Sequence, residues 1–148
     1  MANTQAMATS FKVELLNGHH AFGTSVTRGA TTADSFKAAL YLASATTNAS
    51  NTAYTATGEV SGTNYTAGGT ALTTKSLAVA SNLLTFDADD ITFAQHASGF
   101  TDARYAILYN DTGTPSTARL VAYNDLGSDR SNVNSDLVLQ FPTGLFVT

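Results

Sequence analysis

The sequence predicts an all-β domain, a β-sandwich of short strands, from three observations. Charged residues make up only 12% of the 148 residues, about half of the ~25% expected for a soluble domain, and Thr, Ser, Asn, Ala and Gly take their place. Abundant Thr favours extended backbone, because its β-branched side chain packs well on a pleated surface. Short runs of alternating apolar residues are separated by Asn, Asp, Gly and Ser, which is typical of strands joined by turns.

The N-terminal part of the chain is expected to stay outside the sheets. Residues 1–10 are small, polar and uncharged, so we predict a flexible arm that either frays or lies on another subunit. Residues 11–17 predict a short helix, because Ser10 is a good N-cap and Gly18 stands where a left-handed residue would end it. Two turns are marginal alone, so this helix must dock its apolar side on the sheet. Residues 18–33 lack a period and are predicted to be loop.

The middle of the chain predicts several strands around one long connection. Residues 35–43 alternate between an apolar and a mixed face, which indicates a strand. Residues 44–69 are mostly Thr, Asn, Ser, Ala and Gly and predict a long connection with one short strand at residues 59–61. Such a length points to a functional or contact-making loop. Further strands are predicted over residues 70–75, 77–80 and 83–86, and around Ile91 and Phe93.

The clearest local pattern is a β-hairpin in the C-terminal half. Residues 103–109 and 118–123 are strand-like and flank a break of Asn, Asp, Gly and Pro, which is turn chemistry. Large residues on both faces of the first strand, such as Ile107 and Leu108, predict that it lies inside a sheet. Residues 126–134 predict a polar loop, and residues 137–141 and 145–147 the last strands. Residues 11–148 are therefore expected to form one β-sandwich domain, and a jelly-roll connectivity fits the strand count.

Charge and cysteine content exclude several classes of partner. The net charge is −4, and the seven Lys and Arg residues are scattered, so no basic stripe is available for nucleic acid. Without cysteine there is no disulfide framework or thiolate metal site. The N-terminus lacks a signal-peptide pattern, and no apolar run approaches the ~18 residues of a membrane helix. The low-charge surface fits either a Thr-rich soluble domain or one covered by neighbours in an assembly.

Two groups of residues carry potential metal-ligating chemistry. They are an acidic turn, Asp87, Asp89 and Asp90, and the histidines His19, His20 and His96. The acidic turn lacks the further ligands and the glycine of a calcium loop, and acidic turns between strands are common. Adjacent histidines do not project together from a strand, so a shared metal would need a third ligand from far away. We therefore expect no metal and no cofactor.

Catalytic patterns are also lacking in the sequence. No serine lies in a G-x-S-x-G elbow, and no acid is placed to orient a histidine by a visible pattern. The six tyrosines could form a sugar-binding platform, although packing in cores and interfaces is the commoner use of such residues. They are Tyr41, Tyr54, Tyr65, Tyr105, Tyr109 and Tyr123.

Several segments together carry a resemblance to a known family. The sequence of residues 10–23, 34–46, 52–72, 103–110 and 120–129 resembles small virion proteins of tailed bacteriophages. The likeness spans most of the chain, and its motifs are strand and turn segments rather than a catalytic signature.

The resemblance implies a non-enzymatic structural protein of the virion. The expected role is capsid decoration, or cement: binding to the outer surface of the shell, as a trimer or dimer, and stabilising the major capsid protein. The candidate contacts are residues 1–10, 45–69, 112–117 and 128–134. One alternative is a tail- or fibre-associated adhesin that contacts host glycan; another is a cell-wall hydrolase, for which the sequence shows no site.

Overall fold

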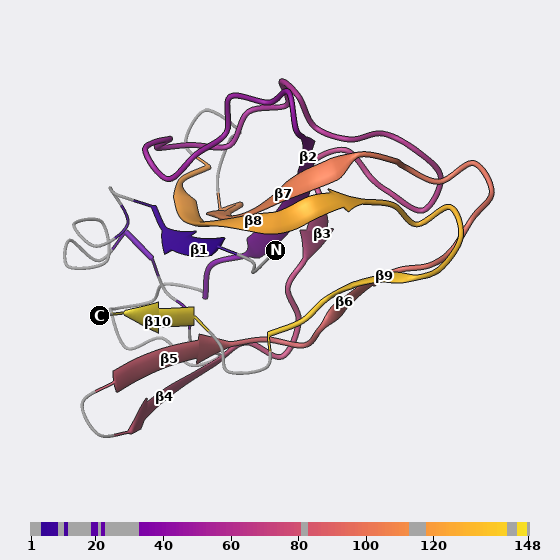
Figure 1. Cartoon of the computed structure of the whole chain (residues 1–148). Coiled ribbons are helices and arrows are strands. Elements are labelled where there is room, and N and C mark those ends of the chain that lie inside the picture. The colour runs from indigo at the N-terminus through magenta and orange to yellow at the C-terminus, as the bar shows by residue number, and fades with distance from the viewer. Residues whose placement is uncertain are drawn as a thin grey trace.

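The computed structural model describes residues 4–8, 11, 19–20, 22, 33–80, 83–112, 118–141 and 145–147. Every element named within these residues is a β-strand, and all strand pairs are antiparallel, which confirms the all-β class. The strands are β1 (Thr4–Met7), β2 (Phe36–Leu42), β3 (Thr70–Ala71), β4 (Ser76–Ala80), β5 (Leu83–Asp87), β6 (Ile91–Phe93), β7 (Ala103–Asn110), β8 (Leu120–Arg130), β9 (Leu137–Leu139) and β10 (Leu145–Val147) (Figure 1).

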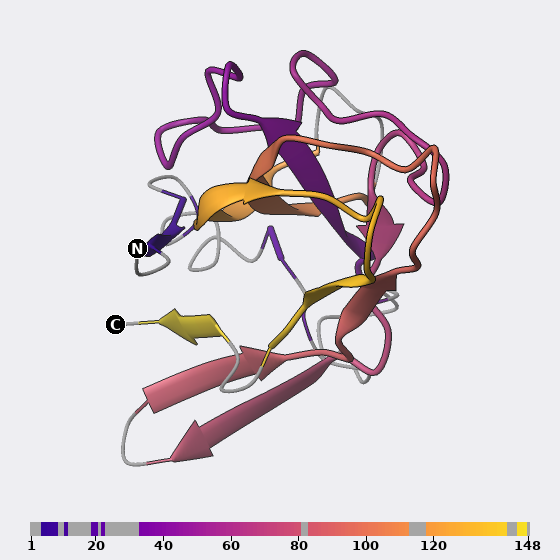
Figure 2. The ribbon, with the colours of Figure 1, turned by 45° about the vertical axis from the view of Figure 1, so that its right-hand side comes forward.

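The strands form three sheets. The largest has five strands in the order β1-β8-β7-β2-β3, the second has three in the order β10-β5-β4, and β6 and β9 form a two-stranded ribbon. The five-stranded and three-stranded sheets lie on opposite sides of the molecule in both views, and the ribbon runs along one side (Figures 1 and 2).

The predicted hairpin is the centre of the five-stranded sheet. Strand β7 pairs with β8 on one side and with β2 on the other. Five consecutive residues of β7, from Ala106 to Asn110, are buried. Because successive side chains point to opposite faces of a sheet, this run confirms that both faces of β7 are covered. Strand β2 behaves in the same way, with Ala39 and Leu40 fully buried.

One face of the five-stranded sheet is covered by an aromatic cluster. Phe36 of β2 stacks on Phe22 at a centroid distance of 4.5 Å. Phe22 in turn meets Phe86 of β5 edge to face, also at 4.5 Å. Since β2 and β5 belong to different sheets, the three rings join the five-stranded and three-stranded sheets into one core, in geometries that aromatic pairs favour.

The opposite face is covered by the long connection of residues 43–69, which we call the loop platform. Tyr109 pairs with Lys37, so its side chain points away from the Phe36 face, and Tyr54 of the loop platform stacks on it at 4.6 Å. The backbone N–H of Tyr54 also donates to the carbonyl of Ala118 near the start of β8 (2.8 Å). The strand predicted at residues 59–61 is reduced to a single bridge between Glu59 and Tyr41.

The prediction of a polar loop over residues 126–134 is wrong for its first half, because β8 continues to Arg130. Ala103 of β7 pairs with Arg130, with a register shift before Tyr105. Gly127 has a φ of 77°, which glycine adopts without the steric cost of a side chain. Strand pairing uses backbone groups, so this polar segment pairs while residues 128–130 leave their side chains exposed.

Two other strands are shorter than predicted. Strand β3 covers only Thr70–Ala71 of residues 70–75, and Thr74 has a φ of 48° just before β4 begins. Strand β9 ends at Leu139 instead of residue 141. Beyond it, the N–H of Phe141 donates to the side chain of Asp90 (2.9 Å). Beyond the end of β9, the Asp90 side chain therefore accepts a hydrogen bond that the backbone of a paired strand would otherwise accept.

The N-terminal segment differs from the flexible arm that was expected. Residues Thr4–Met7 form β1, which pairs with β8 from Asp125 to Ala122. A polar segment can be held in this way because the ladder needs no apolar side chains. The helix predicted over residues 11–17 lies outside the described residues except for Phe11, which is buried.

Adjacent glycines at the end of the loop platform give a matched stability test. Gly68 and Gly69 have φ values of 89° and 79°. A Cβ on Gly69 would lie 2.1 Å from the carbonyl oxygen of Ala38, whereas on Gly68 its nearest neighbour is the Tyr109 hydroxyl at 3.6 Å. Both Ala variants carry the cost of positive φ, and only Gly69→Ala adds a backbone clash. We expect Gly69→Ala to be less stable than Gly68→Ala by about 2 kcal/mol in urea unfolding; equal stabilities would contradict this close packing.

Candidate functional site

The loop platform is anchored by one carboxylate. Glu59 Oε1 accepts hydrogen bonds from the hydroxyl of Tyr65 (2.5 Å) and the N–H of Gly68 (2.8 Å), and Oε2 accepts one from the hydroxyl of Tyr54 (2.7 Å). The Tyr65 hydroxyl also accepts the N–H of Leu40 in β2 (3.0 Å). Charge-assisted bonds of this kind are stronger than neutral ones, so Glu59 ties residues 54, 65 and 68 of the loop platform together, and Tyr65 links them to β2.

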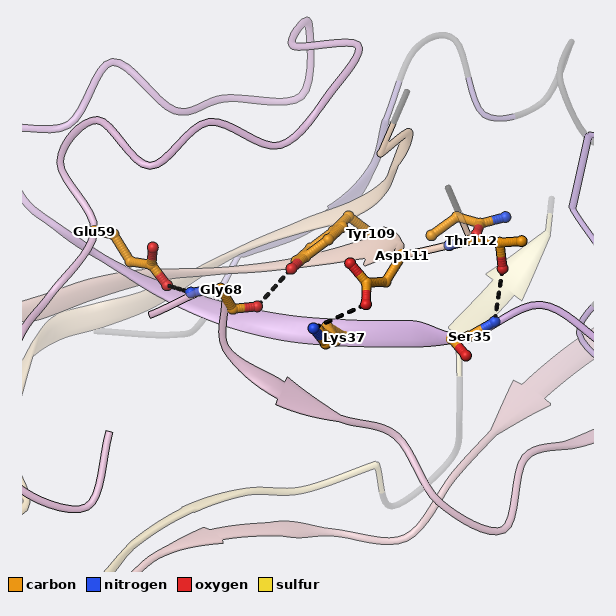
Figure 3. Close-up of polar contacts among 8 residues, drawn as sticks. Ser35, Lys37, Glu59, Gly68, Tyr109, Asp111 and Thr112 are labelled. Atoms are coloured by element: carbon orange, nitrogen blue, oxygen red, sulfur yellow. Dashed lines mark hydrogen bonds and ion pairs between the residues drawn. The ribbon is translucent and has the colours of Figure 1, made fainter. Parts of the chain in front are cut away.

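Two tyrosines of the sheet reach up to the same segment. The Tyr41 hydroxyl donates to the carbonyl of Thr55 and the Tyr109 hydroxyl to the carbonyl of Gly68, each at 2.5 Å. Figure 3 shows Gly68 between Glu59 and Tyr109. Hydroxyl groups from the sheet therefore satisfy carbonyls of an irregular segment that has few ladder partners.

The outer surface of the loop platform is uniform in chemistry. All of its exposed side chains belong to Ala, Ser, Thr or Asn. Its one charged residue, Glu59, is half-buried and turned to the tyrosines. The loop platform is thus a fixed, uncharged surface of small side chains.

Alkaline pH is expected to unfold the protein through these tyrosines. Burial raises the pKa of Tyr41, Tyr54, Tyr65 and Tyr109 above the usual value near 10, and the hydrogen bonds of Tyr54 and Tyr65 to Glu59 add to it. The folded state thus favours the neutral phenol, while the unfolded chain ionises near pH 10. This contribution to stability is complete below about pH 10 and is lost as the pH rises further.

A pH titration followed by phenolate absorbance and circular dichroism tests this expectation. Most of the tyrosine ionisation should coincide with loss of the β-sheet signal. Six tyrosines that ionised independently near pH 10 while the fold stayed intact would contradict it.

A second buried polar group ties three loop segments together. Asn132 is 0% exposed. Its Oδ1 accepts the N–H of Phe100 (2.8 Å), and its Nδ2 donates to the carbonyls of Ala94 (2.9 Å) and Thr63 (3.3 Å). Its backbone carbonyl accepts the N–H of His96 (2.9 Å). We call the loops that meet here, residues 62–65, 94–102 and 131–136, the polar tip; they converge on the right-hand side of Figures 1 and 2.

The three carboxylates of the acidic turn point to different partners. Asp87 accepts the N–H of Ala88, and Asp90 accepts that of Phe141. Asp89 accepts the hydroxyls of Thr74 and Thr73, which lower the pKa of its carboxyl. Each carboxylate therefore accepts hydrogen bonds from its own backbone N–H or hydroxyl donors. In the described part of the chain, no three acidic or histidine side chains gather closely enough to hold a metal ion.

The three histidines lie in different environments. His19 is exposed, His20 is buried, and His96 belongs to the polar tip. Asn110 Nδ2 donates to Asp34 (2.8 Å) and lies 3.2 Å from His20 Nδ1, while its Oδ1 accepts the N–H of Thr112 (2.8 Å). Because the amide nitrogen can only donate, Nδ1 of His20 is the acceptor of this contact.

The six tyrosines do not form one aromatic surface. The hydroxyls of four of them, Tyr41, Tyr54, Tyr65 and Tyr109, donate to residues of the loop platform. The other two, Tyr105 of β7 and Tyr123 of β8, are half-buried neighbours at a centroid distance of 5.4 Å. Beside them Arg104 and Asp125 form an ion pair (2.7 Å). Any aromatic contact surface on these strands is thus limited to this pair.

The other expected contact segments are described only in part. Of residues 112–117 only Thr112 is described; its hydroxyl accepts the N–H of Ser35 (2.8 Å), beside an ion pair between Lys37 and Asp111 (2.8 Å) (Figure 3). Residues 131–134, by contrast, belong to the polar tip together with part of the 45–69 segment. The structure therefore brings two of the four expected contact segments together.

Sequence reasoning missed the two residues that organise these loops. Glu59 is one of only two glutamates in the chain, and two tyrosines flank it at residues 54 and 65, which is a weak signal of a buried carboxylate. Asn132 carries no such signal, because its side-chain partners lie 32 to 69 residues away.

Comparison with known proteins identifies no relative: no family model matches the chain, and neither a curated protein nor a solved structure matches it significantly. Among the described residues, no helix has the length and apolar character needed to cross a bilayer. The function must therefore be inferred from the residues and contacts of the chain itself.

Proposed function

We propose that this protein is a structural component of a tailed-bacteriophage virion that decorates the outer capsid surface. In this role it is a β-sandwich of jelly-roll type, without enzymatic activity, that binds as a trimer or dimer and bridges subunits of the major capsid protein. The sequence resemblance supports the family, and the loop platform supports a binding role.

The observation that carries the proposal is the fixed, uncharged surface of the loop platform. Burying charged groups in an interface is costly unless each one is paired, and the cores of interfaces are depleted of them. A surface of Ala, Ser, Thr and Asn avoids that cost. Loops already held by Glu59 and the tyrosines also lose less conformational entropy on binding than mobile loops would.

Binding to the assembled shell would stabilise the shell by mass action, because the protein prefers assembled subunits to free ones. Capsids prepared without this protein provide the test. Added protein should co-sediment with them, reach hundreds of copies per particle and raise the temperature at which they disrupt. Failure to bind, or capsids equally resistant to heat and low salt with and without it, would overturn the decoration role.

A tail- or fibre-associated adhesin is the second candidate. The half-buried pair of Tyr105 and Tyr123, next to the ion pair of Arg104 and Asp125, places ring faces beside charged hydrogen-bonding groups, which suits contact with the apolar faces and hydroxyls of a glycan. Immunogold labelling of virions separates the two roles. Label on the tail with a dozen or fewer copies would select the adhesin.

A further inference from the structure

We propose that the protein docks on the capsid shell through the polar tip, and that its partner there is a protein surface that offers cationic and other hydrogen-bond donors. This inference rests on the proposed function, because it assigns the contact face for that same role. The loops of the polar tip are held together by one buried side chain, and they expose carboxylates but neither Lys nor Arg.

The loops of the polar tip are locked by a single side chain. Asn132 uses its amide oxygen and both amide hydrogens on backbone groups of Phe100, Ala94 and Thr63. A further backbone bond, from the N–H of Thr63 to the carbonyl of Ser98 (2.8 Å), joins two of the loops directly. Surface loops are usually mobile, so a buried and fully hydrogen-bonded amide under them makes a pre-shaped surface that loses little entropy on binding.

Glycines allow the loops to approach this closely. A Cβ on Gly62 would lie 2.4 Å from the backbone nitrogen of Phe100, and one on Gly99 would lie 2.1 Å from Oδ1 of Asn132. Real Cβ atoms do not approach so closely, so the contact between the segments requires hydrogen at both positions. The close approach of these loops therefore depends on glycine at both positions.

Two exposed residues give the polar tip its backbone shape. Asn64 and Asp102 have φ values of 64° and 61°, the left-handed region that Asn and Asp tolerate better than most residues. Both are exposed. Both residues with this less favourable backbone conformation therefore lie at the surface, where the conformation contributes nothing to the packing of the hydrophobic core.

The exposed groups define the chemistry of the partner. The polar tip contains neither Lys nor Arg, which argues against phosphate or nucleic acid. Its exposed ionisable side chains are those of His96, Asp102 and Asp136, and the others are small or neutral. Val138, two residues beyond the polar tip, is 40% exposed, the one clearly exposed large hydrophobic side chain among those whose burial the structure describes. Two carboxylates among neutral hydrogen-bonding groups, next to an apolar side chain, fit a protein surface that supplies cationic donors.

Matched serine variants test the assignment. Ser98 lies on the polar tip, and Ser76 begins β4 in the three-stranded sheet, outside both the polar tip and the loop platform; both are exposed. Ser98→Arg and Ser76→Arg make the same chemical change at these two places. Their affinities for capsids prepared without the protein would be compared with that of the unaltered chain by co-sedimentation.

We expect Ser98→Arg to weaken binding about tenfold or more and Ser76→Arg to change it less than about twofold, with unchanged melting temperatures. Ser135→Arg, on another loop of the polar tip, should repeat the loss and replaces Ser98→Arg if that variant melts early. Normal binding of both polar-tip variants, or loss only in Ser76→Arg, overturns the inference and leaves the proposed function standing. If the unaltered chain does not bind capsids, the proposed function fails, and the inference fails with it.

Discussion

Asn132→Asp is expected to destabilise the fold by about 5 kcal/mol at neutral pH, the largest effect of any substitution considered. The new carboxylate would be fully buried, as Asn132 is, and would face the carbonyls of Ala94 and Thr63, to which the amide now donates. A buried charge without a partner costs several kcal/mol, and each carbonyl left without a donor adds about 1–3 kcal/mol.

The loss should depend on pH in a defined direction. Burial against two carbonyls raises the pKa of the introduced carboxyl above the ~3.9 of the unfolded chain. The protonated form can donate to one carbonyl, so the variant comes closest to the parent below about pH 4 and falls behind as the pH rises. Urea unfolding of both proteins between about pH 4 and 7 measures this difference.

Asn134→Asp is the matched control, because Asn134 lies two residues away and is exposed. It should change stability by less than about 0.5 kcal/mol at any of these pH values. A difference between Asn132→Asp and its parent that did not depend on pH would show that the amide of Asn132 is not the donor in these contacts.

Ile107→Ala or Leu108→Ala should each cost about 2–5 kcal/mol. Ile107 is 2% exposed and Leu108 6%. They lie on opposite faces of β7, Ile107 between Ala39 and Tyr123 and Leu108 between Ala38 and Ala122. Their alanine neighbours are too small to refill the space, so a cavity would remain on either face. Chemical unfolding measures the loss, and Val138→Ala should cost far less, because Val138 is the exposed residue of β9.

The same variants separate folding from binding. If β7 and β8 are a scaffold, Ile107→Ala and Leu108→Ala lose capsid binding only under conditions in which they unfold. A variant that stayed folded and still failed to bind would make the hairpin the interface. That result would contradict both the loop platform and the polar tip as contact surfaces.

Local pattern was sufficient for much of the sheet. The alternation of residues 35–43 and the two-sided apolar run of residues 103–109 identified β2 and β7, and the latter was correctly predicted to be interior. Alternation with a period of two identifies such strands because neighbouring side chains point to opposite faces, so their polarity shows which face is buried. The long connection at residues 44–69 was also expected from its length and composition.

The sequence patterns failed where backbone pairing, or a partner distant in the chain, determines the structure of a segment. Residues 126–130 read as loop, yet they continue β8 because β7 offers an unpaired edge as far as Ala103. Residues Thr4–Met7 form β1 for the same reason. A strand edge holds a segment through its N–H and C=O groups, and those groups are the same in every residue except proline.

The sequence by itself determined the all-β class, the central hairpin and the uncharged character of the long connection. Only the tertiary structure decided that this connection covers one face of the sheet, held by Glu59, and that Asn132 ties three loops into the polar tip. The physical reason is range: alternation and turn chemistry act between near neighbours in the chain. A buried carboxylate or amide is instead satisfied by groups that only folding brings within hydrogen-bonding distance.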